Sequence, residues 1–240
     1  AFFCYTLFMK KCLSNFDLKL IAIITMTIDH IGVVFGTPFY NLLRAVGRLS
    51  FPIFAFLLTE GYVHTKSFSK YFLRLLVLAL ISEVIYDYVF FGSFIYRGAN
   101  NIFFTLALGL LTLFLLDKSK GLIKRYFKDK VDLFIILPIT YLLIIVIMGL
   151  MGEFLNVSYG MLGILVISFF YLFKTNFPLV VISVSLSTLI LGEGMQYFSL
   201  FSLILIYFYN QKLGMKCKLF FYLYYPLHIL VLGFIKMLMG

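Results

Sequence analysis

The recurrence of apolar runs, each long enough to cross a membrane, constrains this chain more than any other feature. A helix needs roughly 20 residues at about 1.5 Å rise per residue to span a hydrocarbon core. Backbone polar groups in lipid must be bonded within their own segment or within a closed barrel, so helices are the default. Of the 240 residues, 63% are hydrophobic and 12% are charged, which excludes an ordinary soluble domain. The sequence therefore predicts an all-α, polytopic transmembrane helical bundle.

We expect about nine spans, within roughly eight to ten. They cover residues 17–37, 42–63, 70–91, 101–117, 132–151, 157–174, 177–192, 196–210 and 217–239. The seventh and eighth spans are short and are separated only by "GEGM". A re-entrant hairpin therefore remains open at that point.

The distribution of basic residues predicts the orientation. All of the 20 lysines and arginines except Arg44, Arg48, Arg97 and Lys236 lie at ends that are inside if the N-terminus is cytoplasmic. The net charge of +10 is thus a topology signal and argues against nucleic acid as a partner. No linker interrupts the spans, so we expect a cytoplasmic segment over 1–16 and one membrane domain over 17–240. The "MKK" after residue 8 looks like a natural start, so residues 1–8 are interpreted as not native.

Polar side chains gather at one depth in four consecutive predicted spans. Each ionisable residue within a span costs about 2.5 to 3.5 kcal/mol on insertion scales and is tolerated mainly beside a cavity or a partner. Structural pairing of the arginines with the carboxylates explains part of this set. A histidine is not needed for such pairing, and its pKa near 6.5 suits proton transfer. The outer-half set is Asp29, His30, Arg44, Arg48, Glu83, Asp87, Asn100, Asn101 and Thr105.

A second polar set lies at the predicted cytoplasmic ends. Snorkelling cations explain it, and an anion site for phosphates is the alternative. Lys19 and His30 connect the two levels, because 11 residues at about 100° each return to within roughly 20°, about 16 Å further along one helix face. That stripe suits a long donor with a phosphate head and a buried reactive end, such as an acyl-coenzyme A. The inner set is Lys19, Glu60, His64, Lys66, Lys70 and Arg74.

His228, in "YLYYPLHIL", is a second buried histidine, for which a structural core role and a direct catalytic role both remain open. Pro226 should interrupt the local helix ladder beside it. The many Phe and Tyr are interpreted as mostly lipid-facing or packing residues.

The chain resembles the TraX family from Asp17 to about Leu232. The resemblance is carried by an ordered set of motifs: DHIG at 29–32, GR-x-x-FP at 47–52, EG-x-x-H-T at 60–65, N-x-x-x-TL at 101–106 and YP-x-H at 225–228. Two positions depart from the family pattern, Asn156 where an acidic residue is expected and Gln211 where "YNQ" replaces a YNG turn. The family is named for a protein that N-acetylates F-type pilin. The departures mean that pilin itself is not assumed to be the substrate.

Lys19 and His30 also resemble the basic residue, ten residues, histidine signature of transmembrane acyltransferases of the acyltransferase-3 type. The resemblance implies acetyl-CoA as donor, no metal, and a bacterial inner-membrane location among lipids. It also implies that His30 is catalytic and that coenzyme A enters from the cytoplasm. Our own hypothesis is an acyl transfer with His30 as general base and Asp29 or Glu83 orienting it. Arg48 and Asn101 would stabilise the oxyanion. We assign the donor to Lys19, Arg74, His64, Lys70 and His228. We assign the acceptor to Arg44, Asp87, Thr105 and Tyr225.

Two other classes of function stay open. A proton-coupled transporter or flippase would use the same polar residues as a translocation site, with His30 as a proton relay. A scaffold of a surface or secretion complex would need neither property. The acceptor, an amine or hydroxyl of a pilin, another surface protein or a glycan at the outer face, is not named by the sequence. A covalent acyl-histidine and a homodimer also remain open.

Overall fold

The computed structural model describes residues 11–127 and 130–239, and regular secondary structure in these ranges is helical apart from two isolated bridges. Residues 1–8, whose native status the sequence questions, lie outside the described ranges. The elements are α1 (Asn15–Phe35), α2 (Tyr40–Gly47), α3 (Ser50–His64), α4 (Phe68–Phe91), α5 (Ile102–Tyr126), α6 (Lys130–Phe154), α7 (Gly160–Leu172), α8 (Phe177–Leu191), the 3-10 helix η1 (Gly194–Phe201), α9 (Ser202–Tyr207) and α10 (Lys218–Met239).

These elements confirm the all-helical class of the prediction. Within the described ranges, five segments are long and apolar enough to cross a membrane: Asn15–Phe35, Tyr40–His64, Ile102–Tyr126, Leu133–Phe154 and Leu219–Met239. Three apolar segments, α7, α8 and Gly194–Tyr207, are shorter. The 24-residue α4 is long enough but carries two cations and two carboxylates. The count of nine crossings and the orientation stay predictions.

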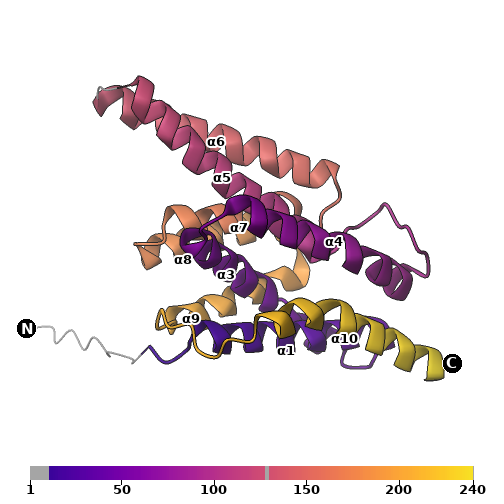
Figure 1. The fold of residues 1–240 in the computed structure, drawn as a ribbon. Coiled ribbons are helices and arrows are strands. Elements are labelled where there is room, and N and C mark those ends of the chain that lie inside the picture. Colours follow the sequence, from indigo (N-terminus) through magenta and orange to yellow (C-terminus); the bar gives the residue numbers. More distant parts are fainter. Residues whose placement is uncertain (1–10, 128–129, 240) are drawn as a thin grey trace, which may run out of the picture.

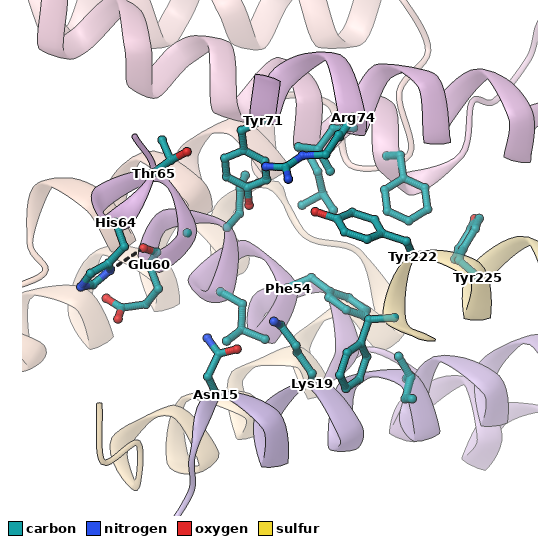
Figure 2. A pocket seen from close by; sticks show the side chains of 18 of the residues that line it. Asn15, Lys19, Phe54, Glu60, His64, Thr65, Tyr71, Arg74, Tyr222 and Tyr225 are labelled. Carbon is teal, nitrogen blue, oxygen red and sulfur yellow. Dashed lines mark hydrogen bonds between the residues drawn. The ribbon is translucent and has the colours of Figure 1, made fainter. Parts of the chain in front are cut away.

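The described helices pack side by side into one bundle. Figure 1 shows α1 and α10 along one side, α3, α7 and α8 in the middle, and the α5–α6 hairpin projecting beyond the other helices. Side chains of α1, α3, α4, α5 and α10, with two loops, enclose the cavity drawn in Figure 2.

The second predicted span, 42–63, is not one continuous helix. It divides into α2 and α3 at a turn over Arg48 and Leu49. The physical reason is Pro52, which has no backbone N–H to donate to the carbonyl group four residues earlier. Gly47 lets α2 approach α1 closely, because a side chain there would overlap that of Asp29. The turn and the close approach bring both arginines of this segment against α1.

The helix that carries the Lys19–His30 stripe is continuous and has a defined start. Ser14 Oγ accepts the backbone N–H of Asp17, and the Asp17 carboxylate accepts the backbone N–H of Ser14 at 2.8 Å. This capping box satisfies donors that a helix start leaves unbonded. Gly36, with φ of 55°, ends α1. One rigid helix therefore sets the separation of Lys19 and His30.

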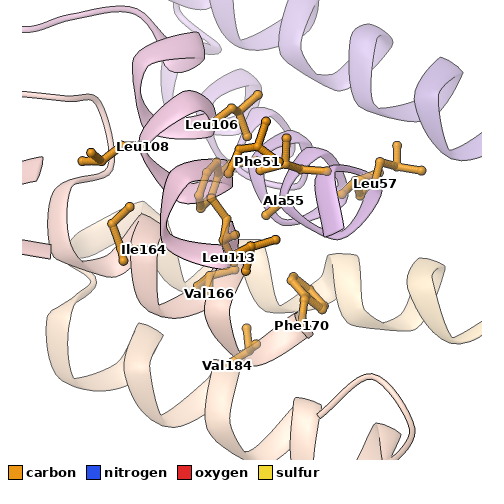
Figure 3. Packing of buried hydrophobic residues seen from close by; sticks show 14 of the residues in the cluster. Phe51, Ala55, Leu57, Leu106, Leu108, Leu113, Ile164, Val166, Phe170 and Val184 are labelled. Atoms are coloured by element: carbon orange, nitrogen blue, oxygen red, sulfur yellow. The ribbon is translucent and has the colours of Figure 1, made fainter. Parts of the chain in front are cut away.

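The main hydrophobic core joins α3, α5, α7 and α8 (Figure 3). On α5, Leu110, Leu113 and Leu116 are fully buried. Gly109 of α5 lets Ile167 of α7 pack on its backbone. In contrast, only 17% of the apolar window of α6 is buried, so most of this helix is left for lipid. The core holds α3, and with it one wall of the cavity drawn in Figure 2, in place.

Candidate active site

A cavity of about 700 Å³ opens beside the starts of α1 and α4 and the ends of α3 and α9; we call it the inner cavity. Figure 2 shows Lys19 and Asn15 on one wall, Arg74, Tyr71 and Tyr222 opposite, and Glu60 and His64 at one end. Of the residues predicted for the donor, Lys19, His64 and Arg74 line this cavity. Lys66, which was not assigned to the donor, lines it too. Lys70 and His228 do not. The inner cavity thus has basic groups around an otherwise largely apolar and tyrosine-rich wall.

The cations of the inner cavity stand against aromatic rings. The Arg74 guanidinium lies 5.8 Å from the centroid of the Tyr71 ring, and Lys19 Nζ lies 5.4 Å from that of Phe221. Cation–π contacts of this kind stabilise a positive charge in a partly apolar wall. A side chain at Gly61 would collide with the Tyr71 hydroxyl, at 2.8 Å. Glycine at this position therefore leaves room for the Tyr71 ring, against which Arg74 lies.

The end of α3 is tied to the loop after α9. The Tyr209 hydroxyl donates to Glu60 Oε2 at 3.3 Å. Burial, with the Glu60 carboxylate second, raises the pKa of Tyr209 to about 12. Two residues later, Gln211 has φ of 62° and also lines the inner cavity. A non-glycine residue in this left-handed region is uncommon, so the departure from the family's glycine falls where glycine would relieve strain.

A second, smaller cavity of about 320 Å³ lies further along α1; we call it the outer cavity. It is lined by four of the predicted polar residues, Asp29, His30, Arg44 and Arg48. Aromatic side chains supply most of the remaining wall: Tyr40, Phe51, Phe54, Tyr86, Phe90, Phe91, Tyr159 and Tyr225. The outer cavity is therefore the smaller of the two, with charged groups and aromatic rings in its wall.

Asp29 is held between two arginines. It accepts Arg44 Nη1 at 2.5 Å, and both of its oxygens accept Arg48 Nη2 at 2.9 Å. Its side chain is 8% exposed, so the carboxylate needs such partners. Two guanidinium groups against one carboxylate leave an excess of one positive charge at this wall. Asp29 makes no hydrogen bond to His30 among the interactions described.

The side chain hydrogen-bonded to His30 is that of His228, on α10. His30 Nδ1 lies 2.7 Å from His228 Nε2, and the two ring planes are nearly parallel, with 5° between them. His228 Nδ1 lies 2.9 Å from the Tyr224 carbonyl oxygen. A carbonyl only accepts, so His228 carries its proton on Nδ1, and its neutral ring accepts at Nε2. His30 then donates from Nδ1, and its Nε2 keeps a lone pair for a general base.

Besides His228, five of the residues that we assigned to catalysis, the donor or the acceptor line neither described cavity. Glu83 accepts the Asn101 backbone N–H at 2.9 Å and the Asn101 Nδ2 at 2.6 Å. Asn101 also caps α5 through Phe103 N, so this pair joins α4 to the start of α5. Asp87 accepts the backbone N–H of Tyr96 at 2.7 Å. The remaining two residues are Thr105, which is fully buried, and Lys70 on the exposed side of α4.

The two cavities share four lining residues: Met26, Phe54, Ile102 and Tyr225. The sequence indicates only Tyr225, through the YP-x-H motif. The inner cavity also contains Tyr71, Tyr209 and Tyr222, which were interpreted as packing or lipid-facing residues. An aromatic side chain in an apolar helix carries no signal of which face it takes. The cavities therefore adjoin.

These features define an all-helical membrane protein that encloses a histidine pair and an arginine–carboxylate cluster next to a cation-lined cavity. The chain matches the family described as TraX protein over residues 14–236. It therefore belongs to the TraX family, which confirms the resemblance predicted from the motifs.

Two relatives extend this result. The chain is 29% identical over 249 residues to the probable fimbrial assembly protein FimC, serogroup H1, of Dichelobacter nodosus, covering 93% of this chain and 96% of the relative. It is 33% identical over 92 residues to the uncharacterized protein RP591 of Rickettsia prowazekii (strain Madrid E), covering 38% and 33%. No solved structure matches the chain. The family and the first relative indicate a pilus-related membrane protein.

Proposed function

We propose that the protein is an integral membrane acyltransferase that moves an acetyl group from acetyl-CoA to an amine or hydroxyl at the outer face. The observation that carries this proposal is the His30 ring, which has an assigned free Nε2 in a cavity adjoining a second, cation-lined cavity. A base at the reacting centre and a separate site for a charged donor are the two parts that acyl transfer from coenzyme A requires. The proposed location is the bacterial cell membrane.

The inner cavity suits the donor. Lys19, Lys66 and Arg74 present positive charge to phosphate groups at its mouth, and the tyrosine-rich interior suits the thin arm that carries the thioester. Lys19 and His30 are 11 residues apart on one helix, which separates the phosphate end from the base by about 16 Å. A long donor with its head at Lys19 thus presents its reactive end to His30.

The outer cavity suits the chemistry. His30 Nε2 takes the proton of the acceptor amine or hydroxyl as that group attacks the thioester carbonyl. A carbon–nitrogen or carbon–oxygen bond forms, the carbon–sulfur bond breaks, and the proton passes to the departing coenzyme A thiolate. The excess positive charge of Arg44 and Arg48 lies on the same cavity wall, where it favours the oxyanion. His228 holds the ring of the base.

The acceptor is proposed from the relatives. A family named for TraX and a relative named as a probable fimbrial assembly protein favour a pilin or another surface protein, with a surface glycan as the remaining class.

The test uses acetyl-CoA labelled in its acetyl group. Membranes from cells lacking the gene supply the acceptor, and purified protein is added in detergent. We expect label to appear in a surface protein or glycan, and His30→Ala to lower the initial rate by about 10²- to 10⁴-fold. Ile24→Ala, on the exposed side of the same helix, is the matched control and should keep the rate. Wild-type rates in His30→Ala protein would refute the role of His30.

The adjoining cavities also suit a translocation route, which makes transport the second candidate. Reconstituted protein that moves a solute in response to a pH difference, without binding acetyl-CoA or releasing coenzyme A, would favour the transporter. Label transfer without solute movement would favour the acyltransferase.

A further inference from the structure

The boundary between the two cavities is built from one side chain of each of four helices. Met26 comes from α1, Phe54 from α3, Ile102 from α5 and Tyr225 from α10. We call these four residues the partition. Figure 2 shows Phe54 and Tyr225 toward the end of the inner cavity away from Glu60 and His64. A ligand that extends from the inner to the outer cavity must pass between these side chains.

The partition is packed rather than loose. Met26 and Tyr225 are buried, in a small cluster with Ile23 and Ile229. Phe54 and Ile102 pack against both this cluster and the main core. Side chains held from two sides have few alternative positions, so the width of the passage is defined by their size.

The partition lies close to the base. The ring centroid of Tyr225 is 6.2 Å from that of His30, and Met26 precedes His30 by one helical turn. A thioester that reaches His30 therefore has its carbonyl at or just past the partition. Its acyl chain then occupies the 320 Å³ outer cavity, where the acceptor must also enter.

We propose that the partition selects the acyl group by length, with Phe54 as the principal specificity-determining residue; this rests on the acyltransferase function proposed above. Each added methylene takes room from the acceptor or presses on the partition. A pocket of fixed size discriminates by about 10- to 200-fold for each methylene. Phe54 is singled out because Tyr225 and Met26 adjoin His30, whereas Phe54 is on α3 and forms no contact with His30 among those described.

The experiment compares acyl groups. Purified wild-type protein, acceptor membranes and a series of acetyl-, propionyl-, butyryl- and hexanoyl-CoA are mixed, and release of the coenzyme A thiol is measured. We expect kcat/KM to fall at least about tenfold from acetyl to butyryl. Phe54→Ala should raise the butyryl-to-acetyl ratio at least about tenfold, and Phe54→Leu, a smaller enlargement, should raise it by less.

Phe56→Ala is the matched control. Phe56 is two residues further along α3, is also partly buried, and packs on Phe170 and Tyr209 without lining either cavity. This variant should leave the ratio unchanged while removing the same number of atoms. Phe54→Leu keeps the test valid if Phe54→Ala protein does not fold.

The outcomes separate the two proposals. Wild-type transfer of acetyl with a butyryl-to-acetyl ratio that neither Phe54 variant changes would overturn the role of Phe54 and leave the acyltransferase function standing. An equal change in Phe56→Ala protein would also overturn it. No thiol release from any acyl-CoA by the wild-type protein would overturn the proposed function, and the specificity role with it.

Discussion

The inner and outer cavities contain similar charged groups but connect them differently. In the inner cavity Lys19 and Arg74 stand on opposite walls, each against its own aromatic ring. In the outer cavity Arg44 and Arg48 share the single carboxylate of Asp29, and His30 is bonded to His228. Groups that act separately should contribute additively to affinity, whereas groups with shared partners should fail together. We therefore expect substitutions in the inner cavity to have independent effects and substitutions in the outer cavity to disturb the whole cluster.

The largest expected effect comes from breaking the shared carboxylate. Asp29→Ala leaves two arginines without their partner in a partly buried site, and removing one member of a buried ion pair costs about 3–5 kcal/mol. Thermal unfolding in detergent, followed by loss of monodisperse protein, measures this. Glu193→Ala, at an exposed carboxylate, should stay within about 0.5 kcal/mol of wild type. Equal stability of the two variants would show that the outer cluster is not interdependent.

The histidine pair should show the next largest effect. His228→Ala removes the acceptor for His30 Nδ1, so the tautomer with a free Nε2 loses its preference. We expect kcat to fall about 10- to 100-fold while KM for acetyl-CoA stays constant. His228→Gln offers a carbonyl oxygen as a substitute acceptor and should restore part of kcat. A rise in KM instead would place His228 in donor binding, as the sequence-based assignment has it.

The inner cations should give smaller, additive effects. Lys19→Ala and Arg74→Ala each remove a positive charge from the proposed phosphate site, and we expect the Kd for acetyl-CoA to rise about tenfold for each. Because the two residues stand on opposite walls, the double variant should lose about a hundredfold. Binding of labelled acetyl-CoA measures both. A double variant no weaker than the single ones would show that these charges act as one unit.

The smallest effect concerns Tyr209. Its pKa in the folded protein is raised to about 12 from the ordinary value of 10.0, so the unfolded chain ionises first as pH rises. Stability should then fall between about pH 10 and pH 12 and be unaffected by this group at lower pH. Tyr209→Phe should lack this contribution, so the difference in unfolding temperature between the variant and wild type should change across that window. A difference that stays constant from pH 9 to pH 12 would contradict it.

The face that a residue takes could be predicted from the sequence along one helix, but not across different helices. Lys19 and His30 line adjoining cavities as the period of a single helix predicts. The sequence predicts that Glu83 and Asn101 lie with His30 and the arginines. In the structure they lie at the contact of α4 with α5 and bind each other. That outcome depends on the rotation of α4, which a pattern of apolar residues leaves undefined.

The histidine pair shows the same limit. His30 and His228 are 198 residues apart, and their contact depends on how α10 lies on α1. Each was recognisable as a buried histidine, but no spacing rule relates residues on distant helices. The break in the second span had a local signal in Pro52, which an apolar-run criterion does not use. Interactions within a helix were therefore predictable, and interactions between helices were not.

The short helices α7, α8 and η1–α9 have a consequence for the surrounding bilayer. Helices α7 and α8 have 13 and 15 residues and are about 20 Å long, against about 30 Å for a typical hydrocarbon core. The α5–α6 hairpin, with 25 residues in each helix, has no such deficit. We expect lipid to thin beside the short helices and to keep its full depth beside the hairpin. Since η1 contacts α2, headgroups on the thinned side would come nearest to the helix that carries Arg44.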